Sequence, residues 1–299
     1  MSLGKITIGT RGSALALKQA DITAKAIRAI DPSVEIHVRV IETHGDVNQN
    51  PIPLDTIGKS WFTKEIEGAL LDGEIDLAVH SLKDMAEDMP EGLCIGAYLQ
   101  REDARDALIT KRGETLDRLR RGAVIGTDSA RRQIQMKALR PDVVMQSLRG
   151  NVPKRLEKLA TEAYDAVILA SAGLKRLGLE EKITRYFTIE EMTPAPGQGT
   201  LAVQARTVDH ALDELLTRIN DADAAHISRI ERSFSATVGG GCKSPTGAYA
   251  VRDGDECIFT GMIVAEDGRI IRDTIRSPWK SSDSLGKTLA SKLLAARGV

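Results

Sequence analysis

The sequence has few cysteines, few aromatic residues and no excess of charge of either sign. Its three cysteines, Cys94, Cys242 and Cys257, form no CxxC pair, which argues against a disulfide framework and against a zinc ribbon. Aromatic residues make up only 3% of the chain, so Val, Ile, Leu and Ala must do most of the core packing. A formal net charge of -1 is unusual for a general nucleic-acid binder, and we predict no nucleic-acid partner.

Long apolar runs and metal-binding patterns are also missing. No stretch approaches the roughly 18 apolar residues that span a bilayer, and the first residues lack the apolar segment of a signal peptide. We therefore predict a cytoplasmic protein with no membrane partner. The histidines have no metal-ligand spacing and no HExxH motif occurs, so no metal is predicted.

Strand and helix patterns alternate through the first two thirds of the chain, which predicts α/β domains with largely parallel sheets. The predicted strands are Lys5–Thr10, Val34–Ile41, Asp76–His80, Cys94–Tyr98, Val124–Gly126, Val143–Ser147 and Ala166–Ala170. The predicted helices are Ala14–Ile30, Phe62–Leu71, Ser129–Leu139, Pro153–Thr161 and Ala172–Leu177.

The pattern changes after about residue 222. A helix over Ala224–Thr237 precedes three alternating strands and a last helix, and Asp253-Gly254 and Asp267-Gly268 mark hairpin turns. A chain of 299 residues exceeds what one core usually serves. We predict an α/β lobe over 1–99 with 200–221, a second α/β lobe over 100–199, and a small α+β domain over 222–299.

Two strand–turn–helix segments resemble one another. Ile8–Ala14 and Ile125–Ala130 each hold a strand that ends in Gly-Thr and a serine that opens the next helix. Such a helix start presents unpaired backbone N–H groups to an anion. The similarity predicts two domains of like topology, and the alternative is a pair of ordinary strand–cap–helix turns.

A glycine-rich segment over 239–245 surrounds Cys242. Three successive glycines predict a loop with open backbone, in which the thiol is reachable. Lys243 would favour the nucleophilic thiolate. The alternative is an incidental surface cysteine. Cys94 and Cys257 lie in apolar strand patterns and are predicted to be core residues.

The segment Asp76–Asp84 joins a buried strand to a group of polar side chains. Ligands of open α/β sheets bind beyond the carboxyl ends of strands. There Lys83 can hold an anion, and Asp84 can stabilise a cation or move a proton. The alternative is a helix cap with a surface ion pair.

Basic residues recur near the predicted turns. Arginine forks that converge at one sheet edge bind carboxylates or phosphates through two bonds. The alternative for each residue alone is a solvated surface position. These residues are Arg11, Lys59, Arg131, Arg132, Arg149 and Arg155.

Together these motifs resemble those of the porphobilinogen deaminase (hydroxymethylbilane synthase) family, from about Ile6 to Ala250. Their order and number make the resemblance specific. The matching segments are Gly9–Ser13 with Leu15-Ala16 and Gln19, Thr43 with Gly45-Asp46, Gly58-Lys59 with Phe62–Glu65, Asp76–Asp84, Arg101–Asp103 with Arg105–Ala107, Gly126-Thr127 with Ser129 and Arg131-Arg132, Leu148–Asn151 with Arg155-Leu156, Ala172–Leu174 with Arg176-Leu177, Pro196–Gly199, Glu231-Arg232 and Gly240–Cys242.

The resemblance implies two lobes like those of periplasmic binding proteins, and a third domain that carries the cofactor cysteine. The implied cofactor is a dipyrromethane joined to Cys242 through a thioether. The implied activity deaminates four porphobilinogen units, adds them one after another, and releases hydroxymethylbilane by hydrolysis. We therefore predict a monomeric transferase of tetrapyrrole (haem) biosynthesis whose partner is the small molecule porphobilinogen.

The resemblance also implies roles for individual residues. Asp84 and Lys83 are the implied catalytic residues, with Asp84 stabilising positive charge on the pyrrole nitrogens. The implied cofactor-binding residues are Cys242, Ser13, Ser81, Lys83, Asp84, Thr127, Ser129, Arg131, Arg132, Arg149, Gly150 and Arg155. The implied substrate-binding residues are Arg11, Ser13, Lys59, Phe62, Arg149, Arg155, Arg176 and Gln198. Asn48–Asp55 matches a mobile lid.

Seven positions depart from the family pattern: Ser60, Trp61, Ala86, Asp128, Ala130, Pro153 and Gln204. Asp128 adds an acid beside the Arg131-Arg132 pair and is expected to weaken an anion site there. Neither Cys242 nor Asp84 is lost, so an active enzyme is predicted. The alternatives are a non-catalytic two-lobed binding protein for a polycarboxylate ligand, which leaves Cys242 unexplained, and nucleic-acid binding, which the net charge disfavours.

Overall fold

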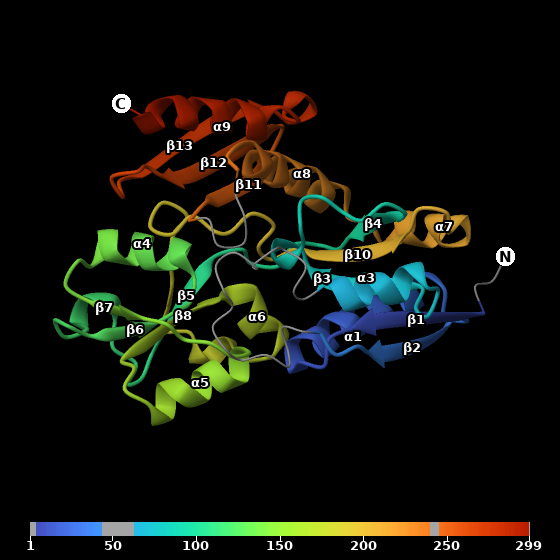
Figure 1. Cartoon of the computed structure of the whole chain (residues 1–299), viewed down its shortest axis with the longest axis horizontal. Helices are drawn as coiled ribbons and strands as arrows, with labels where there is room; N and C mark the ends of the chain where they lie inside the picture. The colour runs from blue at the N-terminus through green and yellow to red at the C-terminus, as the bar shows by residue number, and fades with distance from the viewer. Residues whose placement is uncertain (1–3, 44–62, 240–244, 299) are drawn as a thin grey trace. The chain divides into compact units, whose positions relative to one another are not determined.

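The computed structural model describes residues 4–43, 63–239 and 245–298 (Figure 1). They form two compact units. Unit 1 is Met1–Arg101 with Thr200–Ala225, and unit 2 is Glu102–Gly199 with His226–Val299. Unit 2 holds two separate sheets, and the division into three domains stays a prediction.

Unit 1 contains a five-stranded sheet of order β2-β1-β3-β10-β4 in its described part. Its core is built from Val, Ile, Leu and Ala, as the scarcity of aromatic residues requires. Helices α1 and α7 share one core cluster with the sheet, and α3 packs in another. The elements are β1 (Lys5–Thr10), α1 (Ala14–Ile30), β2 (Glu35–Val40), α3 (Lys64–Leu71), β3 (Leu77–Ser81), β4 (Leu93–Tyr98), β10 (Leu201–Arg206) and α7 (His210–Ile219).

The larger sheet of unit 2 has the order β7-β6-β8-β5-β9. Successive residues of its central strand β8 belong in turn to two hydrophobic core clusters. Ile168 lies in the cluster that contains Met136 of α4, and Val167 lies in the cluster that contains Leu159 of α5. The sheet is therefore covered by helices on both faces, as Figure 1 shows for α4 and α5. The elements are β5 (Asp106–Thr110), β6 (Val124–Gly126), α4 (Ala130–Leu139), β7 (Val144–Gln146), α5 (Val152–Thr161), β8 (Ala166–Ala170), α6 (Ser171–Arg176) and β9 (Arg185–Tyr186).

These two sheets have the same topology. In each sheet one strand pairs in parallel with both of its neighbours: β1 in unit 1 and β6 in unit 2. Another strand is inserted antiparallel between two others: β10 in unit 1 and β5 in unit 2. The similar segments that end β1 and β6 occupy equivalent places, so the predicted likeness of topology is confirmed. The predicted largely parallel arrangement holds for four of the five strands in each sheet, and the inserted antiparallel strand makes each sheet mixed.

The smaller sheet of unit 2 is an antiparallel meander, β11-β12-β13, and α8 and α9 complete one core with it. Phe234 and Phe259 meet edge to face at its centre. Gly254 and Gly268 turn the two hairpins with positive φ, as the predicted turns require. The elements are α8 (Ala222–Thr237), β11 (Gly247–Asp253), β12 (Glu256–Val264), β13 (Ile270–Pro278) and α9 (Leu285–Ala295).

The predicted α/β fold class with a small α+β C-terminal part is confirmed, and most predicted elements lie within two residues of their observed bounds. The sequence patterns missed β5, β9, β10 and α7. The described part of the chain also contains short 3-10 helices, at Leu82–Asp84, Leu116–Arg118, Glu180–Lys182, Trp279–Ser281 and Ala296–Gly298.

Candidate functional site

In unit 1, polar side chains gather where β1 and β3 end. The two strands are parallel neighbours, with Ile8 opposite Leu77, so both chains leave the sheet at the same edge. Ser13 caps α1 there, and its Oγ accepts a bond from the N–H of Ala16 at 3.2 Å. At the end of β3 the Oγ of Ser81 accepts a bond from Gln19 of α1 at 2.8 Å. A hydroxyl that accepts one bond can still donate its hydrogen to a ligand.

The predicted catalytic pair follows Ser81 directly, in the 3-10 turn Leu82–Asp84. Leu82 is buried and fixes the turn against the sheet, while Lys83 is half-buried and Asp84 is exposed. Arg11 is half-buried in the turn between β1 and α1. The edge therefore offers both signs of charge next to two hydroxyl groups.

A buried polar chain supports β3 from within the sheet. Nε2 of His80 lies 3.0 Å from Oε1 of Gln204 on β10, and Nε2 of Gln204 donates to Glu67 of α3 at 3.3 Å. Burial lowers the pKa of His80 to about 4, an effect that the bond to Gln204 opposes and the charge of Arg11 reinforces. His80 is therefore neutral at pH 7, and its Nε2 carries the proton that the amide oxygen accepts.

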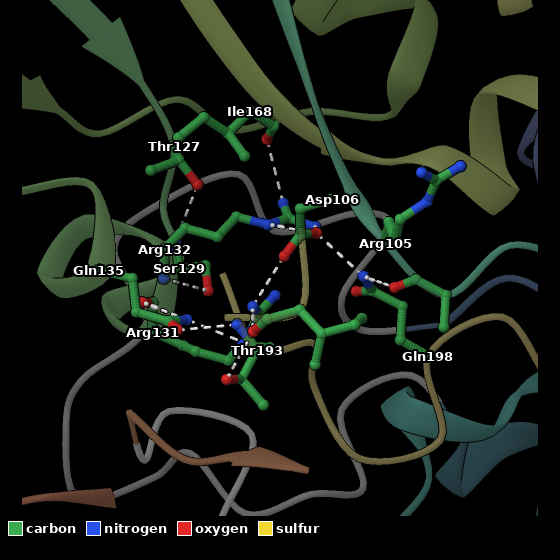
Figure 2. Close-up of polar contacts among 12 residues, drawn as sticks. Arg105, Asp106, Thr127, Ser129, Arg131, Arg132, Gln135, Ile168, Thr193 and Gln198 are labelled. Carbon is green, nitrogen blue, oxygen red and sulfur yellow. Dashed lines mark hydrogen bonds and ion pairs between the residues drawn. The ribbon is translucent and has the colours of Figure 1, made fainter. Parts of the chain in front are cut away.

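In unit 2 the centre of the polar network is Asp106, the first residue of β5, which is fully buried (Figure 2). Nη1 of Arg131 donates to Oδ2 at 2.7 Å, and Nε and Nη2 of Arg132 donate to Oδ1 at 3.0 and 2.7 Å. Gln198 donates to the same Oδ1 at 2.9 Å. Figure 2 shows the three side chains converging on the carboxylate, while the neighbouring Arg105 points away.

This network buries two positive charges with one negative charge. Burial alone would raise the pKa of Asp106, but the charges of Arg131 and Arg132 outweigh it and hold that pKa far below its usual range. The backbone takes up further donors, since Arg131 also binds the carbonyl of Thr193 and Arg132 that of Ile168. The balance is one excess positive charge, which favours a nearby anion.

The network extends to the C-terminal sheet within unit 2. The side chain of Gln135 on α4 binds the N–H and the carbonyl of Thr193, and Arg272 of β13 donates to Gln135 at 2.8 Å and to Oγ1 of Thr193 at 2.8 Å. Buried Glu231 of α8 accepts bonds from the N–H groups of Gly197 and Ala250 at 2.7 and 2.8 Å. The Pro- and Gly-rich segment 193–199 is thereby fixed to β11, β13 and α8.

A second, more exposed group lies at the ends of β6 and β7. Oδ1 of Asp128 accepts from Ser147 at 2.6 Å, and its Oδ2 lies 3.0 Å from Nε of Arg149. Thr127 is buried beside it, and its N–H bonds to the last residue of β7. Arg155 donates to the carbonyl of Gly150 at 2.7 Å. The strand ends meet at one edge, as predicted.

The predicted arginines of unit 2 thus form two groups where one was expected. Arg131 and Arg132 turn inward to Asp106, whereas Arg149, after β7, and Arg155, in the first turns of α5, stay half-exposed. Asp128 pairs with Arg149, although the sequence suggested that it acts on Arg131-Arg132. Asp106 was not among the residues predicted from the sequence, even though it lies inside a matching motif.

Two residues predicted to touch the substrate contact backbone carbonyls. Gln198 is buried and also donates to the carbonyl of Ala104 at 2.7 Å. Arg176 donates to the carbonyl of Gly199 at 2.5 Å, and burial lowers its pKa to about 10 despite the nearby charge of Glu102. Both therefore hold segment 193–199 in place, and direct substrate contact stays a prediction.

Several predicted residues lie outside the described part of the chain. They are Cys242, Lys59, Phe62 and the segment Asn48–Asp55, together with the unusual Ser60 and Trp61. Of the other cysteines, Cys257 is buried in the core as predicted, and Cys94 is only half-buried. Residues 4–43, 63–239 and 245–298 contain no group of His, Cys, Asp and Glu that could hold a metal, and no helix long and apolar enough to cross a membrane.

The fold is that of a two-lobed α/β protein, and cationic side chains gather near the described strand ends. Comparison with known proteins narrows this class. The family described as porphobilinogen deaminase, dipyromethane cofactor binding domain, matches residues 6–214, and the porphobilinogen deaminase C-terminal domain matches residues 225–295. The chain therefore belongs to the porphobilinogen deaminase family, a family of transferases.

The relatives match over almost the whole chain. The porphobilinogen deaminase of Roseiflexus castenholzii is 45% identical and covers 98% of this chain and 97% of its own length. That of Alkaliphilus metalliredigens is 44% identical, over 97% of this chain and 92% of its own length. A TRAP periplasmic solute binding protein from Desulfovibrio salexigens is similar in structure, with a TM-score of 0.42 and 10% identity over 72% of each chain.

Proposed function

We propose that the chain is an enzyme that deaminates porphobilinogen and condenses four such units head to tail, then releases the linear tetrapyrrole hydroxymethylbilane by hydrolysis. The observation that carries this proposal is the match of both family domains in sequence order over 6–214 and 225–295. The placement of Lys83 and Asp84 directly after the buried strand β3 supports it, because ligands of α/β sheets bind at such strand ends.

The proposed cofactor is a dipyrromethane, bound covalently through a thioether at Cys242. Such a group carries several carboxylates, and the described residues suit them chemically. The Asp106 network has one excess positive charge, and Arg149, Arg155 and Arg11 supply further cations. When bound, the group would supply the free pyrrole carbon to which the first unit is joined, and each later unit would join the pyrrole added before it.

The charged residues at the end of β3 have complementary proposed roles. Loss of ammonia from porphobilinogen breaks a carbon–nitrogen bond and leaves positive charge on the pyrrole. Asp84 would accept a hydrogen bond from the pyrrole N–H and stabilise that charge, and Lys83 would bind a substrate carboxylate. Ser13 and Ser81 would donate neutral hydrogen bonds. The free α-carbon of the chain's terminal pyrrole then attacks the methylene carbon that lost ammonia, a carbon–carbon bond forms, and that α-carbon loses its proton.

The remaining residues extend the proposed site. Thr127, Ser129, Arg131, Arg132, Gly150 and Arg155 are proposed to contact the cofactor, and Lys59, Phe62, Arg176 and Gln198 the substrate. A cytoplasmic location without nucleic-acid or membrane partners completes the proposal and rests on composition, whereas the proposed monomer rests on the family resemblance. A non-catalytic polycarboxylate-binding protein is not favoured by the family domains that the chain matches.

Product stoichiometry tests the proposed function. Purified protein is incubated with porphobilinogen, and released ammonia and linear tetrapyrrole are measured. The expected result is four ammonia molecules for each tetrapyrrole released. Porphobilinogen that is bound but never consumed would contradict the proposal and favour the binding protein.

A further inference from the structure

Asp128 presents a carboxylate to Arg149 at the sheet edge where β6 and β7 end. Its Oδ2 is 3.0 Å from Nε of Arg149, and its Oδ1 accepts the Ser147 hydroxyl at 2.6 Å. Ser147 therefore anchors Asp128 through the oxygen that does not face the arginine. A carboxylate of a bound ligand would approach Arg149 with the same charge and the same kind of oxygen.

The charge balance of this pair differs from that of the Asp106 network. There, one buried acid faces two arginines, and one positive charge remains. Here, among the residues that the structure describes, Asp128 is paired with Arg149, and these two charges sum to zero. The Asp128 and Arg149 side chains are 36% and 38% exposed, so an incoming anion meets both charges rather than the arginine alone.

We propose that Asp128 competes internally with ligand carboxylates for Arg149 and thereby sets the affinity of the site. This inference rests on the proposed function, in which Arg149 binds a carboxylate of porphobilinogen or of the growing chain. A ligand must displace Asp128 or bind against its charge, so Asp128 weakens binding without taking part in the chemistry.

The expected size of the effect follows from the exposure of the pair. Surface ion pairs are worth at most about 1 kcal/mol, which corresponds to about fivefold in an equilibrium constant. We therefore expect Asp128→Ser to lower KM for porphobilinogen by about twofold to fivefold, with kcat changed by less than about twofold. A serine removes the charge and keeps a short hydroxyl, and an asparagine removes the charge and keeps the shape of the side chain.

The test compares steady-state kinetics of the wild type, Asp128→Ser and Asp128→Asn at low ionic strength. Both variants should show the lower KM, and 0.5 M salt should reduce their advantage, since salt screens exposed charges. Asp273→Ser removes an acid from another exposed pair, with Lys292, and is the matched control that should keep the wild-type KM. In an Arg149→Ala background, Asp128→Ser should no longer lower KM.

The outcomes separate this inference from the proposed function. An inactive wild-type protein would overturn the function and the inference with it. An active wild type whose Asp128 variants show unchanged KM would overturn the inference alone. A raised KM would also overturn it, because Asp128 would then be holding Arg149 in position for the ligand. A lowered KM that persists without Arg149 would contradict the proposed competition.

Discussion

Replacement of Asp106 by Asn tests the buried network most severely, because it removes the only carboxylate that the structure shows on two buried arginines. Asn can keep one oxygen for Arg132 and Gln198, but its amide N–H would face Nη1 of Arg131, now 2.7 Å from Oδ2. One charge-assisted bond is lost, worth about 1.5–3 kcal/mol. Breaking a buried pair from one side costs about 3–5 kcal/mol in total, since the remaining charge is uncompensated.

The assay is urea unfolding at pH 7, monitored by circular dichroism. We expect the free energy of unfolding to fall by about 3–5 kcal/mol, a large share of the 5–15 kcal/mol typical of a folded protein. The matched control is Asp21→Asn, which also removes one acid from two cations, Lys18 and Lys25, but on the exposed surface of α1. That control should cost less than about 1 kcal/mol.

Two further results follow from the charges. The depressed pKa of Asp106 means that its contribution is complete above the unfolded-state pKa of about 4 and is lost as pH falls through the folded-state value. The difference between the wild type and Asp106→Asn should therefore shrink in acid below about pH 4. Adding Arg131→Gln to Asp106→Asn should restore part of the stability. A cost below about 1 kcal/mol, or no rescue by Arg131→Gln, would refute the reasoning.

Other substitutions test unit 1. Asp84→Ala should keep the fold and the covalent cofactor yet lose nearly all turnover, and near-normal turnover would remove the catalytic role of this exposed side chain. The pKa of His80, lowered to about 4 by burial, lies below its unfolded value of about 6.5, so stability should fall as pH drops between these values. Gln204→Glu, combined with Glu67→Gln so that no second carboxylate faces the new one, should raise the pKa of His80 by about 1–3 units, because a carboxylate replaces the amide at 3.0 Å; an unchanged NMR titration of the imidazole would contradict this.

The local parts of the fold were predictable from the sequence. Strands β1, β6 and β8 and helix α1 have the predicted bounds, because their apolar periodicity and their caps are encoded in adjacent residues. The likeness of the two larger sheets was predictable from the Gly-Thr turns and the serines that follow them. Ser13 and Ser129 both serve as the caps that this pattern indicates.

The inserted strands were not predictable in this way. β5 begins with the charged Asp106, and β10 contains the buried Gln204, so neither shows a clean apolar strand pattern. Their polar residues are buried only because partners far along the chain satisfy them, such as Gln198 for Asp106 and His80 for Gln204. Local periodicity carries no information about such partners.

The candidate site was predictable in its residue types but not in its pairing. The sequence predicted arginines near the turns that follow strands, and the structure agrees for Arg149, which follows β7, and for Arg155, in the first turns of α5. It could not foresee that Arg131 and Arg132 turn toward a buried acid, because surface exposure is the ordinary expectation for arginine. Likewise, only the fold shows that Asp128 pairs with Arg149.

The intact mass of the denatured protein, before and after addition of porphobilinogen, tests the central claim most directly, with Cys242→Ser measured alongside. The proposed enzyme should carry a covalent dipyrromethane increment and then show a ladder of single-pyrrole steps with substrate, and Cys242→Ser should show neither. An unmodified mass that does not change with porphobilinogen would contradict covalent elongation at Cys242 and favour a protein that only binds its ligand.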